Sequence, residues 1–207
     1  MLKKVISIVL SVAFVVSLLA LTSCSIDFRS DVEKAMDKFL KADSYTVTVN
    51  NDLGMHTYMV NNGTVYFFED YDETEKTSYL YSDENDYYYA TVSDGEETQS
   101  IEKAQLKKEA YVIKYMDTIQ ESDIVNQVFA YRHILDMAEK TDKGYKYSVQ
   151  ESTDEYTYRI IYTIEMDDGS LVLTQKYESK KEKYEEQIVI SNVGKTRIEI
   201  PDKVLSK

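Results

Sequence analysis

Residues 155–166, with the sequence EYTYRIIYTIEM, alternate between two kinds of side chain, and this pattern constrains the fold more than any other in the chain. One side carries the aromatic and aliphatic residues Tyr156, Tyr158, Ile160, Tyr162, Ile164 and Met166. The other side is mostly polar, with Thr157, Arg159, Thr163 and Glu165 around Ile161. Successive side chains of a β-strand point to opposite faces of its sheet, so a repeat of two predicts a long strand with one buried face.

Three more strands are expected to follow this one in an antiparallel meander. The pair Asp168-Gly169 is typical of a hairpin turn, which returns the chain along SLVLTQKYES. On that strand Leu171, Leu173 and Tyr177 share the buried face. The stretches YEEQIVISN and KTRIEI are expected to be the last two strands, and Pro201 to end the sheet, because proline cannot donate a ladder hydrogen bond.

The first part of the chain predicts a helix followed by more strands. Ser30 and Glu33 have the spacing of a capping box, and the apolar residues up to Leu40 form one stripe of an amphipathic helix. The next segment, SYTVTVN, alternates like a strand, and Asn62-Gly63 between two β-prone runs predicts a hairpin. Shorter strands are expected at 78–81 and 87–92.

The middle of the chain, from 100 to 140, has a composition that favours helices. Its second half is the clearer part, with Ser122 placed to cap a helix on which Ile124, Val128, Tyr131, Leu135 and Ala138 recur at spacings of three and four. The first half, IEKAQLKKEAYVIKYMDTI, is expected to be helical, although AYVIKYM could also form a strand. The whole pattern predicts an α+β fold with a large antiparallel sheet, an N-terminal helix and one or two central helices.

The N-terminus has the layout of a secretory signal. Lys3 and Lys4 precede an uncharged stretch from 5 to 21, and small residues then lead to Cys24, the only cysteine. An uncleaved membrane anchor is the alternative, because the apolar stretch lies at the short end of the range for a spanning helix. A single cysteine excludes a disulfide within one chain, so packing alone must stabilise the fold.

The four residues LTSC, which end at Ser23 and Cys24, resemble the lipobox of bacterial lipoproteins. The resemblance implies that the Cys24 thiol receives a diacylglycerol and that the chain is cut between Ser23 and Cys24. It further implies a signal peptide at 1–23 and an acylated tether at 24–29. The length of the remaining chain predicts one globular domain at 30–207. The expected location is the extracytoplasmic face of the bacterial cell membrane, where the lipid holds the domain.

Charge and motifs weigh against several function classes. The formal net charge is −13, so binding to nucleic acid, which is itself anionic, is not expected. The glycines are too far apart for a phosphate-binding loop, and His56 and His133 have no partner at metal-ligand spacing. Acidic clusters such as SDEND do not match a calcium loop and are expected to be solvated turns, with weak cation binding as the alternative. We expect a protein that is not an enzyme and that has no cofactor or metal.

The order of predicted elements resembles that of bacterial lipoproteins and lipid carriers of the LolA and LppX type. The similarity is carried by VEKAMDKFLKADSYTVTV, by the hairpin around MDDGSLVLTQKY and by the ending ISNVGKTRIEIP. It implies a strongly curved antiparallel sheet, or half-barrel, whose concave side is closed by helices and can hold a lipid.

Two functions follow as alternatives. The first is binding of a lipid or another amphipathic ligand between the sheet and its helices. The residues expected to line that cavity are Tyr158, Ile160, Tyr162, Ile164, Leu171 and Leu173. The second is an interaction or sensor protein of the cell envelope with a filled core and no ligand. The 19 tyrosines suit either function, since tyrosine combines a large apolar ring with a polar tip, and they also suit a sheet core alone.

Overall fold

The computed structural model describes residues 30–71, 74–83, 85–94, 99–121, 124–152 and 157–206. The predicted signal peptide, Ser23, Cys24 and the predicted tether therefore lie outside the described residues, as do Ser122 and Tyr156. Everything below concerns the unit that begins at Asp31.

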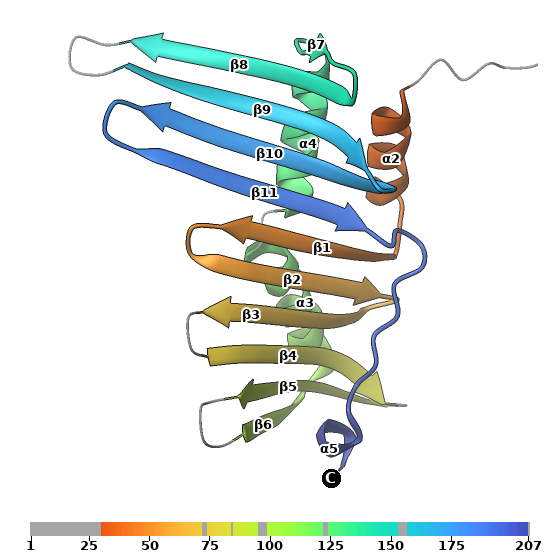
Figure 1. Cartoon of the computed structure of the whole chain (residues 1–207). Coiled ribbons are helices and arrows are strands. Elements are labelled where there is room, and N and C mark those ends of the chain that lie inside the picture. The colour runs from red at the N-terminus through yellow and green to blue at the C-terminus, as the bar shows by residue number, and fades with distance from the viewer. Residues whose placement is uncertain are drawn as a thin grey trace, which may run out of the picture. The chain divides into compact units, whose positions relative to one another are not determined.

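The described strands form one antiparallel sheet of 11 strands in the order β6-β5-β4-β3-β2-β1-β11-β10-β9-β8-β7 (Figure 1). The first six are β1 (Ser44–Asn51), β2 (Gly54–Asn61), β3 (Thr64–Tyr71), β4 (Thr74–Asp83), β5 (Asp86–Asp94) and β6 (Gln99–Leu106). The other five are β7 (Glu139–Lys140), β8 (Gly144–Ser152), β9 (Thr157–Asp167), β10 (Ser170–Ser179) and β11 (Lys183–Ser191). The sheet is thus two meanders, joined where β1 pairs with β11.

Two predicted hairpins are confirmed by their backbone geometry. Asp168 and Gly169 have φ values of 44° and 77° and connect β9 to β10, with Ile164 opposite Leu173 in the register. Asn62 and Gly63 have φ values of 47° and 85° and connect β2 to β3. Positive φ at both central residues defines the type I′ turn, whose twist matches that of the flanking strands.

Three helices lie on one face of the sheet, which is here called the helix side (Figure 1). They are α2 (Asp31–Leu40), α3 (Lys108–Glu121) and α4 (Ile124–Leu135). Helices α2 and α4 cover the sheet around β9, β10, β11 and β1, whereas α3 covers the strands from β2 to β6. Helices form at 31–40 and from Ile124 onward, where the sequence predicted them, but α4 ends at Leu135 and Ala138, expected on the same stripe, lies outside it.

The largest group of core residues lies between α2, α4 and the sheet. Its buried members are Val32, Met36, Phe39, Val47, Val49, Ile124, Val128, Tyr131, Ile164, Leu171, Leu173, Ile188 and Ile190. The strand residues among them are neighbours in the register, for example Leu173 opposite both Ile164 and Ile188. The residues that alternate onto the buried face therefore form one core, in which α2 and α4 pack on strands of both meanders.

The C-terminal segment, residues 192–206, covers part of the opposite face, here called the back. The Thr196 hydroxyl lies 2.9 Å from that of Thr46, and the short helix α5 (Asp202–Leu205) reaches β4 and β5. There Val204 is fully buried in a small core with Tyr79, Tyr81, Ala90 and Val92.

Two local predictions are wrong, and two strands were missed. Residues 101–106 form the strand β6 and not the start of a helix, because pairing with β5 outweighs the helix propensity of Glu, Lys, Ala and Gln. Residues 195–200 form no strand, since β1 already occupies the edge of β11 that a further strand would need. The remaining strands of the C-terminal meander are β8 and the two-residue β7, neither of which we predicted.

Candidate functional site

The six residues predicted to line a cavity are on one face, but the structure divides them into two groups. Ile164, Leu171 and Leu173 belong to the core under α2 and α4, and at most 2% of each is exposed. Tyr158, Ile160 and Tyr162 lie farther along the same face, toward the start of β9, and all three are partly exposed. Only the second group is available to a partner.

The exposed group continues onto the neighbouring strands. Ile160 of β9 is the register partner of Val149 on β8 and of Tyr177 on β10. The tyrosine surface is defined here as Tyr147, Val149, Tyr158, Ile160, Tyr162, Tyr177 and Tyr184, all of which are partly exposed. It spans β8 to β11, whose three spacings of about 4.8 Å give a width of about 14 Å. Figure 1 shows these strands extending past α2 and α4.

The rings of the tyrosine surface pack against one another. Tyr158 stacks on Tyr177 with ring centroids 5.6 Å apart, and Tyr147 stacks on Tyr162 at 6.3 Å. At the boundary with the core, the Tyr131 ring of α4 meets Tyr162 edge-on at 5.6 Å. These contacts hold the rings in place before any partner binds, which lowers the entropy lost on binding.

Two carboxylates lie among these rings. The Tyr158 hydroxyl donates a hydrogen bond to Glu151, and the Tyr184 hydroxyl donates one to Glu186 at 3.1 Å. Burial and the charge of Glu186 raise the pKa of Tyr184 above its usual value. Burial, together with Tyr147, likewise raises the pKa of Tyr162. The charged groups that the described residues place among these rings are thus the carboxylates of Glu151 and Glu186.

The back of the same strands is different in kind. Lys176 and Glu185 are register partners there, and their charged atoms lie 2.9 Å apart. Arg159 and Thr163 also lie on this side. Along β9 they alternate with Tyr158, Ile160 and Ile164, which face the helix side. One strand face is thus aromatic and acidic, whereas the other has charges of both signs.

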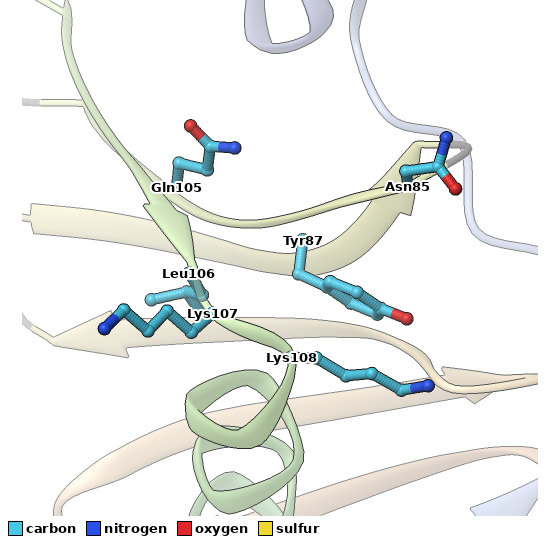
Figure 2. A pocket seen from close by; sticks show the side chains of 6 residues that line it. All are labelled: Asn85, Tyr87, Gln105, Leu106, Lys107 and Lys108. Atoms are coloured by element: carbon cyan, nitrogen blue, oxygen red, sulfur yellow. The ribbon is translucent and has the colours of Figure 1, made fainter.

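Hollows formed by described residues lie elsewhere. One of about 310 Å³ lies beside α2 and includes Leu171, Ala35 and Lys38. Another, of about 640 Å³, lies where β6 leads into α3 (Figure 2). In Figure 2 the Tyr87 and Lys108 side chains extend together, whereas Gln105 and Lys107 point away from them. Because these polar groups do not converge, this hollow lacks the features of a specific site.

A third hollow, the α3 pocket, has polar groups that do converge. It measures about 220 Å³ and lies between α3 and the helix side of β3, β4 and β5. Its polar lining includes Lys76, Lys114, Ser78 and Tyr89. Sequence reasoning missed these residues because they come from three separate segments, and their meeting depends on how α3 is placed over the sheet.

Neither a metal cluster nor a membrane span is found in the part of the chain that the structure describes. No three Asp, Glu, His or Cys side chains come together there in a way that could hold a metal ion. None of the described helices combines the length and apolar character needed to cross a bilayer.

Comparisons with protein families, with curated proteins and with solved structures found no match to the chain. The functional interpretation therefore depends on the chain's own residues.

Proposed function

We propose that this protein is a lipid-anchored interaction protein of the bacterial cell envelope, and that its tyrosine surface binds a basic segment of another polypeptide. The single observation that carries this proposal is the packed, partly exposed group of tyrosines with Glu151 and Glu186 among them.

The chemistry of this surface suits arginine and lysine. A cation gains from contact with the face of a tyrosine ring, and a carboxylate beside the ring adds a charge-assisted hydrogen bond. A net charge of −13 also draws a basic partner toward the molecule. The width of about 14 Å, three strand spacings, exceeds what one side chain covers, which favours a polypeptide over a small cation.

The other predicted function, lipid binding between sheet and helices, receives less support. It needs open space around Ile164 and Leu173, and both side chains are packed in the core with residues of α2 and α4. The resemblance to half-barrel lipid carriers, with the curvature that it implies, stays a prediction.

Anchoring through Cys24 is part of the proposal and is supported by the lipobox resemblance alone. Cys24→Ser should abolish incorporation of a fatty-acid analogue, which gel fluorescence of labelled cells measures. Labelling that persists in this variant would contradict the anchor and would leave the tyrosine surface unaffected.

The binding claim is tested with a matched pair of neighbouring glutamates. Glu186→Gln removes a charge from the tyrosine surface, whereas Glu185→Gln removes the same charge from the back. Titration of the full-length protein with a short peptide of alternating arginine and serine should show binding weakened about tenfold by Glu186→Gln, because one charge-assisted hydrogen bond is lost. Equal effects of the two substitutions would mean that net charge alone attracts the peptide, and the proposal would fail.

A further inference from the structure

The α3 pocket differs from the rest of the molecule in its charge. Its described lining has two lysines, Lys76 and Lys114, and one carboxylate, Glu69, so these residues sum to a formal charge of +1 in a chain of −13. The Lys76 ammonium lies 4.0 Å from Glu69, which also faces His56 at 4.0 Å. Glu69 is thus shared between two basic groups, and Lys114 is left to contribute the excess positive charge.

The register of the sheet explains why these groups meet. Glu69 lies opposite Lys76, and Phe67 lies opposite Ser78, so one face of β3 and β4 presents them side by side. Lys114 comes from α3 above the sheet, where its ammonium lies 4.8 Å from the centre of the Tyr89 ring.

A chain of hydroxyl groups lies beside the lysines. The Tyr89 hydroxyl donates to Ser78 at 3.2 Å, and the Ser78 and Thr91 oxygens lie 3.1 Å apart. Burial acts to raise the pKa of Tyr89, but hydrogen bonds with Ser78 and Thr91 and the charges of Lys114 and Lys76 outweigh it, so the pKa lies below its usual value. The electrostatic environment at this end of the pocket therefore favours negative charge.

The pocket has a small apolar part. Val65 and Leu80 are register partners that lie buried beneath it, with at most 2% of each exposed, and the partly exposed Phe67 beside Glu69 offers the apolar surface. A ligand that fits both parts must have an anionic end and an apolar end. The volume of about 220 Å³ lies below the range of about 300 to 1,000 Å³ that is usual for drug-sized ligands, so the ligand must be small.

We propose that the α3 pocket binds a small amphipathic monocarboxylate, with its carboxylate between Lys76 and Lys114 and its alkyl chain against Phe67. A single negative charge matches the formal charge of the pocket. A phosphate ester carries more charge and needs more donors than two lysines with a shared glutamate provide. This inference does not depend on the tyrosine surface, because the two sites share no residue.

The test uses hexanoate as the probe and ligand-observed NMR of the full-length protein in detergent. Lys114→Met keeps the apolar stem and removes the charge, so hexanoate binding should weaken at least about tenfold. Lys181→Met is the matched control, since Lys181 is an exposed lysine in the turn between β10 and β11, and it should leave the affinity unchanged. The same measurement with 1-hexanol, which lacks the charge, should show much weaker binding to the unmodified protein.

A second substitution, which is expected to strengthen hexanoate binding, makes the test more stringent. Glu69→Gln removes the one carboxylate among the lining residues that the structure describes, so hexanoate should bind several-fold more tightly. Thermal melts of each variant check that it is folded. The proposal is overturned if hexanoate does not bind, if 1-hexanol binds equally well, or if Lys114→Met and Lys181→Met behave alike.

Discussion

Tyr45 connects the two helix-side cores, because its ring packs against the residues under α2 and α4 and also against those under α3. Burial, with a smaller effect of Tyr115, raises the pKa of Tyr45 to about 12, from an ordinary value of 10.0. Between these two pH values the unfolded chain loses the phenol proton more readily than the folded protein does. The contribution of Tyr45 to stability is therefore complete below pH 10 and is lost as the pH rises toward 12.

Tyr45→Phe should make the loss of stability between pH 10 and 12 shallower, since phenylalanine has no proton to release. Urea melts at a series of pH values measure the slope. Tyr89→Phe is the contrasting variant: its pKa is lowered in the folded protein, so its ionisation adds stability as pH rises, and its removal should make the loss steeper. Slopes that are identical in all three proteins would contradict this account.

At the scale of elements, helix α2 is held against the sheet by individual buried side chains. Phe39 is 2% exposed and meets the Tyr45 ring edge-on, with centroids 4.8 Å apart. Phe39→Ala should therefore lower the free energy of unfolding by about 3 to 5 kcal/mol in denaturant melts. Lys38→Ala, one residue earlier on an exposed position, should change it by less than about 0.5 kcal/mol. A loss below about 1 kcal/mol for Phe39→Ala would mean that α2 does not pack as described.

Elements whose apolar residues recur with a clear helical or strand period were predictable from the sequence. Elements whose conformation depends on pairing with a neighbouring strand were not. Local sequence was enough for α2 and for the β9–β10 hairpin, where burial follows the alternation from Ile164 to Leu173. The strand β6 has the composition of a helix and is a strand only because β5 offers it a partner. The candidate sites depend even more on tertiary placement. Tyr158 and Leu173 lie on the same face of the sheet, and the positions of α2 and α4 decide which of them is exposed.

At the scale of the whole unit, the C-terminal segment ties the two meanders together. After β11 it runs along the back to β4 and β5, where the backbone oxygen of Val204 accepts hydrogen bonds from Tyr81 at 3.2 Å and Lys103 at 3.0 Å. Because this segment follows the last strand of one meander and contacts strands of the other, it should make unfolding more cooperative.

Val204→Ala should consequently destabilise the whole unit by about 2 kcal/mol, because a fully buried side chain loses two methyl groups. The neighbouring Leu205 is 46% exposed, so Leu205→Ala is a matched control with an expected effect of less than about 0.5 kcal/mol. Denaturant melts compare the two. Equal effects would indicate that α5 is not held against the sheet through Val204.

The central claim, that the tyrosine surface binds a basic polypeptide, is tested most directly by site-specific photo-crosslinking in cells. A photoreactive amino acid replaces either Ile160, on the tyrosine surface, or Ile161, on the back of the same strand. The proposal predicts an adduct at 160 whose cross-linked segment is rich in arginine and lysine, no such adduct at 161, and loss of the adduct when Glu186→Gln is added. Equal adducts at both positions, no polypeptide adduct at 160, or an adduct there with lipid alone would contradict it.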